Sequence, residues 1–201
     1  MKLSTMEQKV SYGYGRNIAY QFAEFLDKID FDALLEGLKD GRDQAPLPLP
    51  PEEIDAAYQE FNEQLAKARE EKLSSQTKAN ADYLAENAKK PGVITTESGL
   101  QYEVLNEGTG RKPTKADKVR VHYHGTLVNG DVFDSSVARN DPAEFGVTQV
   151  IKGWVEGLQL MNEGSKYKFT IPAHLAYGDQ AVGSIPPRSV LVFEVELLKV
   201  L

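Results

Sequence analysis

The chain has 201 residues, a formal net charge of −7 and no cysteine. An acidic chain without a basic run excludes recognition of the phosphate backbone of nucleic acids, and the lack of cysteine excludes disulfides and thiolate chemistry. No stretch is long and apolar enough to span a bilayer, and residues 1–15 lack the apolar core of a signal peptide. We therefore expect a cytoplasmic protein without nucleic-acid or membrane partners. The alternative is a periplasmic protein whose signal peptide has been removed.

Residues 1–50 are predicted to be helical. Apolar residues recur in the first helix at the spacing of one helical face. Asp30 or Asp32 is expected to cap a second helix, and Gly41 is expected to end it. The proline-rich run 45–51 cannot be helical throughout and is predicted to be a connector. Fewer than about fifty residues rarely build a stable core alone, so this segment is expected to need a second chain.

Residues 51–91 are predicted to form one long linker helix. Pro51 suits its first turn, and neither glycine nor proline occurs between residues 52 and 89. Apolar residues are dense as far as Leu65 and then thin out among charges and amides. A helix that is polar all round must stand in solvent or pair with another helix. We therefore expect the early part to pack and the later part to stand in water as a stalk.

Residues 92–201 change to a hydrophobic period of two. Four segments alternate apolar and polar residues: 100–104, 119–123, 167–171 and 193–197. This pattern predicts antiparallel strands with one buried face each. A single short helix is expected within residues 153–161, where it could cover the sheet. The predicted fold class is α+β, with a helical N-terminal part followed by an antiparallel sheet.

The residues offer few groups for conventional catalysis. His122 and His124 lie two apart on a predicted strand and share a face, which could begin a zinc site. A third ligand is not evident nearby, and zinc sites need three or four. We therefore predict no metal and no cofactor, with the histidine pair left as an open alternative.

Aromatic residues are concentrated in the second half of the chain, where they could form a core or line a pocket. These are Tyr123, Phe133, Phe145, Trp154, Tyr177 and Phe193. Trp154 begins the only predicted helix of this half, and Tyr177 lies in a loop, where an aromatic often marks a binding site. Asp134 precedes two serines and is either a turn-capping acid or a polar group beside such a pocket.

Six short motifs follow one another in a fixed order. They are Val121–Leu127 (VHYHGTL), Asn129–Ser136 (NGDVFDSS), Val150–Trp154 (VIKGW), Ala176–Gly178 (AYG), Ile185–Pro187 (IPP) and Leu191–Leu198 (LVFEVELL). Together they closely resemble the FKBP family of peptidyl-prolyl cis-trans isomerases, over residues from about 95 to 201. The resemblance implies a curved antiparallel sheet wrapped over a short helix and an apolar cup that binds proline.

The resemblance also implies roles for residues of the cup. The residues matching the catalytic set are Tyr123, Phe133, Asp134, Tyr177 and Phe193. The residues matching the contacts to substrate, or to macrolide inhibitors such as rapamycin and tacrolimus, are Arg139, Phe145, Val150, Ile151, Trp154 and Ile185. In the family the tryptophan forms the floor of the cup, and the backbone N–H matching Ile151 holds a substrate carbonyl. Ala143 departs from the pattern, because many members carry a second aromatic residue there.

The helical half resembles the dimeric bacterial members of the family that are related to macrophage infectivity potentiator; residues 6–15 give the best match. In those proteins the N-terminal helices of two chains intertwine, and the long helices hold two catalytic domains apart in a V. The resemblance implies three parts: a dimerisation domain over 1–50, a linker helix over 51–91 and an isomerase domain over 92–201. We expect a V-shaped homodimer that isomerises X-Pro bonds in unfolded or partly folded proteins. The alternative is a non-catalytic folding helper that only holds proline segments or macrolides.

Overall fold

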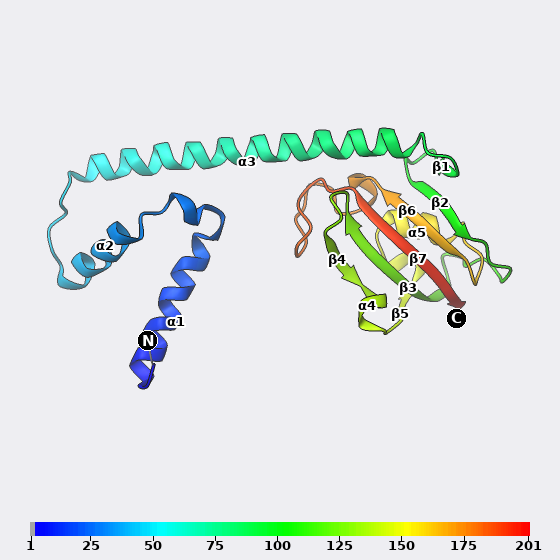
Figure 1. Cartoon of the computed structure of the whole chain (residues 1–201), viewed down its shortest axis with the longest axis horizontal. Coiled ribbons are helices and arrows are strands. Elements are labelled where there is room, and N and C mark those ends of the chain that lie inside the picture. The colour runs from blue at the N-terminus through cyan, green and yellow to red at the C-terminus, as the bar shows by residue number, and fades with distance from the viewer. Residues whose placement is uncertain (1–2) are drawn as a thin grey trace. The chain divides into compact units, whose positions relative to one another are not determined.

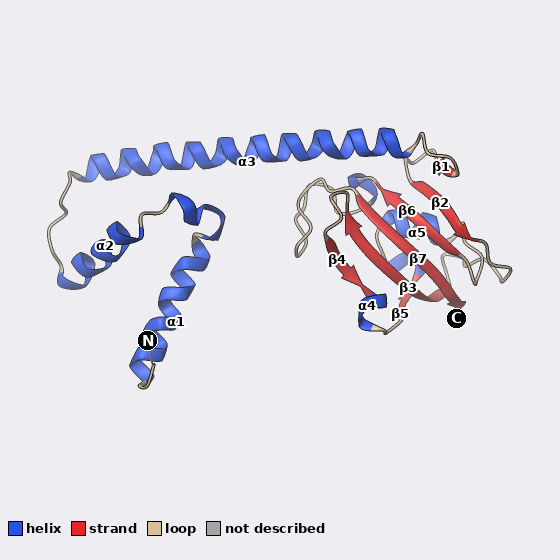
Figure 2. Cartoon of the chain, viewed as in Figure 1, coloured by secondary structure: helices blue, strands red, loops and turns tan. Residues whose placement is uncertain are grey.

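The computed structural model describes residues 3–201, which form two compact units divided between Asn62 and Glu63. Figures 1 and 2 show helices in the N-terminal half and the sheet in the C-terminal half. The fold class is α+β, as predicted. The predicted domain boundaries at residues 50 and 91 stay predictions. Of the helices that these residues form, none is both long enough and apolar enough to cross a bilayer.

The first unit consists of helical segments joined by short connections. They are α1 (Met6–Gln21), the 3-10 helix η1 (Ala23–Lys28), α2 (Phe31–Asp43) and the start of α3 (Pro51–Asn87). The Asp30 carboxylate accepts the N–H groups of Asp32 and Ala33 at 3.0 Å, so Asp30 is the cap of α2. The prediction that α2 ends at Gly41 was wrong. The helix continues to Asp43, because Gln44 takes the left-handed position that ends it.

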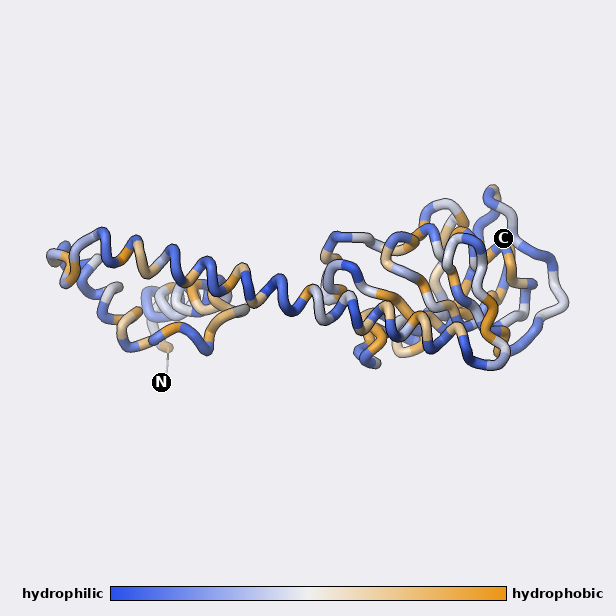
Figure 3. Tube along the Cα trace, turned by 90° about the horizontal axis from the view of Figure 1, so that it is seen from above, coloured by the Kyte–Doolittle hydropathy of each residue, from blue (hydrophilic) through white to orange (hydrophobic). Residues whose placement is uncertain are grey.

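The long helix is confirmed over Pro51–Asn87, but the expectation that its later part stands in water was wrong. In its early part Phe61 packs edge-on against Phe25, at 5.3 Å between ring centroids. The two buried residues of α3 are Asn80 and Asn87, and both lie in the later part, which was expected to stand in water. Figure 3 shows only scattered orange positions among blue ones along this helix. The polar composition of this part led to the prediction that it is solvated. Amide side chains can nevertheless be buried when their hydrogen bonds are made.

The second unit contains an antiparallel sheet that residues 3–201 build from seven strands. These are β1 (Val93–Thr95), β2 (Gln101–Asn106), β3 (Lys118–Leu127), β4 (Val132–Ser135), β5 (Ala143–Gly146), β6 (Lys166–Ile171) and β7 (Leu191–Val200). The strand order is β1-β2-β6-β7-β3-β4, and β5 pairs with the first half of β3. The remaining short helices are α4 (Ser136–Arg139), η2 (Val147–Gln149), α5 (Lys152–Leu158) and η3 (Ala173–Leu175).

The hydrophobic core lies between the sheet and α5. The alternation predicted for the central strands is confirmed, since Val119, Val121, Phe169, Val195 and Leu197 are all buried. Close packing of α5 depends on a glycine. A Cβ atom at Gly157 would lie 2.7 Å from the Phe169 ring, so only glycine lets the helix approach the sheet this closely.

The first predicted strand differs from the expected pattern. In β2 the polar Gln101 is buried, whereas Val104 is exposed. The side-chain amide of Gln101 donates to the backbone carbonyl of Leu84 in α3 at 2.9 Å and accepts from Asn87 at 2.9 Å. Docking of α3 therefore buries Gln101, a residue that alternation alone predicts to face solvent, while Leu100 before it is buried as expected.

Candidate active site

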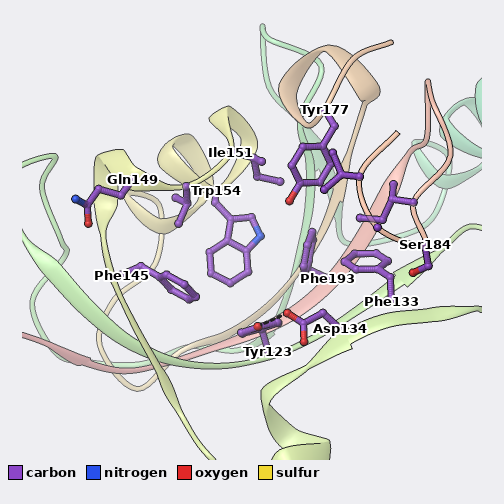
Figure 4. Close-up of a pocket in the computed structure, with 14 residues that line it drawn as sticks. Tyr123, Phe133, Asp134, Phe145, Gln149, Ile151, Trp154, Tyr177, Ser184 and Phe193 are labelled. Carbon is purple, nitrogen blue, oxygen red and sulfur yellow. Dashed lines mark hydrogen bonds between the residues drawn. The ribbon is translucent and has the colours of Figure 1, made fainter. Parts of the chain in front are cut away.

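A cavity of about 640 Å³ opens within the second unit, between α5, the central strands and two loops. We call it the cup. Ten of the eleven predicted site residues line it: Tyr123, Phe133, Asp134, Phe145, Val150, Ile151, Trp154, Tyr177, Ile185 and Phe193. Figure 4 shows these side chains converging on one space from α5, β3, β4, β5, β7 and the loops. Residues spread over 71 positions of the chain thus meet because β3 and β7 are neighbours in the sheet.

The floor of the cup is a cluster of rings in edge-to-face contact. Trp154, in the first turn of α5, has its ring centroid 5.5 Å from Tyr123, 5.2 Å from Phe193 and 5.8 Å from Phe145. Phe133 contacts Phe193 at 5.3 Å. Such perpendicular pairs are the favoured arrangement of aromatic rings, and each stabilises by about 0.5–1.5 kcal/mol beyond its burial. The floor is therefore a rigid apolar surface.

Two N–H groups at this floor have no acceptor: the backbone N–H of Ile151 and the ring N–H of Trp154. Among the described residues, Trp154 Nε1 is the one buried side-chain nitrogen or oxygen atom without a hydrogen-bond partner. The Ile151 carbonyl accepts the N–H groups of Trp154 and Val155 and so starts α5. The Ile151 N–H has no partner among the hydrogen bonds formed within residues 3–201. Because Ile151 lines the cup, its free N–H can donate to a bound carbonyl, whereas Trp154 Nε1 is enclosed by protein.

The polar part of the cup is a three-residue network on one side. The Tyr123 hydroxyl donates to Asp134 Oδ2 at 2.5 Å, and Arg139 Nη1 donates to Asp134 Oδ1. Arg139 Nη2 also donates to the Tyr123 hydroxyl at 3.1 Å. Arg139 itself does not line the cavity, unlike the other predicted residues. It acts on the cup through Asp134 and Tyr123.

The network sets the protonation of both acidic groups. Burial alone would raise the pKa of the Asp134 carboxyl, but the hydrogen bonds from Tyr123 and Arg139 outweigh burial and lower it. Burial raises the pKa of the Tyr123 hydroxyl, and its hydrogen bond to Asp134 raises it further. At neutral pH Asp134 is therefore a carboxylate whose two oxygens are already engaged, and Tyr123 is a neutral donor.

This network leads to a pH prediction. Both groups keep their protonation between about pH 5 and pH 9, since one pKa moves down and the other moves up from the ordinary values near 4 and 10. We expect kcat/KM for a proline tetrapeptide to be constant across this range. A pH profile of kcat/KM with a midpoint near pH 6.5 would instead implicate a histidine.

Asp134→Asn removes the charge and is expected to lower kcat/KM for the same peptide about tenfold. The half-exposed position of the ion pair with Arg139 limits the loss, because solvent screens it.

A short loop forms the far wall. Val182 and Ile185 exchange backbone hydrogen bonds of 3.0 and 2.9 Å, which closes a tight turn through Gly183 and Ser184. We call Val182–Ile185 the loop wall. Tyr177 also lines the cavity, and Figure 4 shows its hydroxyl pointing toward the space above Trp154.

Four lining residues were missed by the sequence reasoning: Gln149, Val182, Gly183 and Ser184. Their position next to predicted site residues could have identified them. Gln149 directly precedes Val150, and the other three lie between Tyr177 and Ile185. A segment of only a few residues between two residues of the cup cannot extend far from it, so these residues stay near the site.

The two histidines of β3 lie outside the cup. His122 Nδ1 lies 3.1 Å from the Ser136 hydroxyl, and His124 Nδ1 lies 3.0 Å from the Ser135 hydroxyl. In residues 3–201, no three acidic, histidine or cysteine side chains gather into a group able to hold a metal ion. The Ser136 hydroxyl also accepts the Tyr123 N–H at 2.8 Å, so this side of β3 supports the position of Tyr123.

Comparisons with known proteins agree with this geometry. The family model of the FKBP-type peptidyl-prolyl cis-trans isomerase matches residues 109–198, and the model of the domain amino terminal to such isomerases matches residues 7–104. Fold and site thus define an isomerase with an aromatic cup. The chain belongs to the FKBP-type peptidyl-prolyl cis-trans isomerases.

Individual relatives cover nearly the whole chain. The FKBP-type 22 kDa isomerase of Escherichia coli K12 is 47% identical over 199 residues, which are 98% of this chain and 97% of that protein. The outer membrane protein MIP of Legionella longbeachae is 40% identical over 203 residues, 98% of this chain and 87% of its own length. The crystal structure of FkpA from Escherichia coli superposes with a TM-score of 0.70 at 35% identity, covering 99% of this chain and 98% of that one.

Proposed function

We propose that the cup of this chain accelerates cis–trans isomerisation of X-Pro bonds in unfolded and partly folded proteins. The observation that carries the proposal is the composition of the lining. Its aromatic and aliphatic side chains surround one charged residue, Asp134, whose carboxylate is engaged by Tyr123 and Arg139. Such a site binds an apolar ring and supplies neither a nucleophile nor a free general base.

Isomerisation needs neither of these. Rotation about the X-Pro bond breaks amide resonance at a barrier of roughly 20 kcal/mol, and no covalent bond is made or broken. Catalysis requires only that the twisted amide bind more tightly than either planar form. A twisted amide has lost resonance, so its carbonyl is less polar than a planar one. The water-excluding rings of Trp154, Phe133 and Phe193 favour that less polar state.

Positioning supplies the rest of the barrier reduction. The unpaired N–H of Ile151 is suited to a carbonyl that flanks the proline, and we propose that the ring of the proline packs on Trp154, which lines the cup. A rate gain of about 10⁵ needs roughly 7 kcal/mol, which is within reach of desolvation combined with positioning. We propose that rapamycin- and tacrolimus-type macrolides bind in the same cup and inhibit the isomerisation.

A peptide assay tests this function against the non-catalytic alternative. We expect the full-length protein to accelerate isomerisation of a proline tetrapeptide, to be inhibited by rapamycin and to keep its rate in EDTA. Binding of rapamycin without any acceleration would favour a folding helper that only holds proline segments. Loss of activity in EDTA, restored by zinc, would revive a role for His122 and His124.

We also propose that the chain works as a homodimer formed through its N-terminal helices. Neither α1 nor α2 contains a buried residue, although both carry large apolar side chains. Val10, Tyr14, Leu35 and Leu38 are each at least 49% exposed. A second copy of residues 1–50 would cover these side chains, and folding would then be coupled to dimerisation.

A dimer would carry two cups, and one client chain could bind both. The second binding event is then intramolecular, which raises the overall affinity without any new contact. This bivalent capture is the chaperone-like role that we propose for the helical part. The cytoplasmic location expected from the N-terminal residues stays a prediction.

A further inference from the structure

The later part of α3 holds the loop that builds one wall of the cup. Three consecutive backbone carbonyls in this loop each accept a hydrogen bond from a side chain. Pro186 accepts from the Ser189 hydroxyl at 2.7 Å, Pro187 from Gln76 Nε2 at 2.9 Å, and Arg188 from Asn80 Nδ2 at 2.8 Å. Gln76 also donates to the Ser189 hydroxyl at 3.1 Å. All three residues directly follow the loop wall Val182–Ile185.

These side-chain donors replace bonds that the backbone cannot make. Pro186 and Pro187 have no N–H, so this segment cannot pair as a strand of the sheet. Gln76 and Asn80 are four residues apart and therefore lie on one face of the helix. Asn80 is only 5% exposed, so its hydrogen bond to Arg188 is shielded from water. In this setting an unpaired carbonyl would be costly.

Arg188 is the point where the loop is closed. Its N–H donates to the Gly178 carbonyl at 2.7 Å, and its Nε donates to Asp179 at 2.6 Å, which joins both ends of the loop. Its φ of 58° lies in the left-handed region, which residues other than glycine seldom adopt. Such a conformation persists only where the surroundings hold it. Asn80, bound to the carbonyl of the same residue, is part of that support.

We propose that Gln76 and Asn80 are positioning residues for the isomerase reaction: from α3 they hold Pro187 and Arg188, and so set the loop wall against bound proline peptides. The inference rests on the proposed function of the cup. Neither residue lines the cavity. Their effect reaches substrate through Ile185, which lines the cup and precedes the two prolines. The helix that the sequence suggested to be a spacer thus supports one wall of the active site through these hydrogen bonds.

Asn80→Leu tests the role in the full-length protein. The substitution removes the donor, keeps a side chain of similar size and raises helix propensity. We expect kcat/KM for a proline tetrapeptide to fall about fivefold, the factor expected for one lost hydrogen bond. Amide hydrogen exchange is expected to accelerate in residues 178–188 while exchange in β3 and β7 stays as in the wild type.

Asn87→Leu is the matched control. Asn87 is the same residue type on the same helix and is 6% exposed, but its amide donates to Gln101 and Thr170 in the sheet. We expect this variant to lose stability while loop exchange stays unchanged and kcat/KM stays within twofold of the wild type. The positioning role is refuted if Asn87→Leu changes the loop and the activity as much as Asn80→Leu does. It is also refuted if Asn80→Leu changes neither.

Gln76→Met serves if Asn80→Leu does not fold, because Gln76 is less buried and methionine has a similar shape. The same two changes are expected, and their absence would refute the proposal. A wild-type protein without isomerase activity would refute the proposed function of the cup. Loop exchange in the variants would still decide whether α3 positions the loop wall.

Discussion

Phe193→Leu is expected to lower kcat/KM for proline tetrapeptides about 100-fold, equivalent to ~2.7 kcal/mol of transition-state stabilisation. Phe193 touches both the floor and the side of the cup, at 5.2 Å from Trp154 and 5.3 Å from Phe133 between ring centroids. Leucine keeps an apolar side chain at this buried position but removes the ring face that both aromatic neighbours contact. The measurement is kcat/KM on peptides, alongside thermal unfolding of the same sample.

The control for this variant is Phe169→Leu. Phe169 pairs directly with Phe193 across β6 and β7, is fully buried and does not line the cup. Both substitutions should lower the free energy of unfolding by similar amounts, since each replaces a buried ring with a smaller side chain. We expect only Phe193→Leu to lose activity in folded protein. Equal losses in the two variants would show that core packing, and not the wall of the cup, carries the effect.

Removing the helical part is expected to separate peptide turnover from protein folding. A fragment of residues 63–201 keeps the compact second unit and the hydrogen bonds from Gln76 and Asn80. We expect it to be monomeric and to keep kcat/KM on tetrapeptides within twofold. For proline-limited refolding of a whole protein we expect a loss of about 100-fold, because bivalent capture is gone. Light scattering and the two rate assays measure these outcomes.

Point variants address the same question in the full-length chain. Leu35→Asp places a charge on an exposed apolar position of α2 and is expected to weaken the dimer, with a matching loss in refolding activity. Leu201→Asp is the control, since Leu201 is similarly exposed but belongs to the second unit. A full-length wild type that is monomeric at micromolar concentration would contradict the dimer. A fragment with full refolding activity would contradict capture and leave the isomerase function untouched.

Periodicity and motif order in the sequence were sufficient for the fold class and most of the cup. Strands with one buried face carry that information locally, because every second residue of β3, β6 and β7 must face the core. The long helix was equally readable, since residues 52 to 89 contain neither glycine nor proline. Family resemblance then placed ten residues that do line the cavity.

The tertiary structure alone decided what the polar residues do. Composition suggested that the later part of α3 stands in water, yet Asn80 and Asn87 are buried against the sheet unit. An amide is polar by any sequence measure, and whether it is solvated or hydrogen-bonded inside the fold depends on partners more than a hundred positions away, such as the carbonyl of Arg188. Arg139 is the parallel case. The resemblance placed it beside Asp134 and Tyr123, and the structure adds that it bonds to both without lining the cavity, because a hydrogen-bond partner is set by three-dimensional proximity and not by residue type.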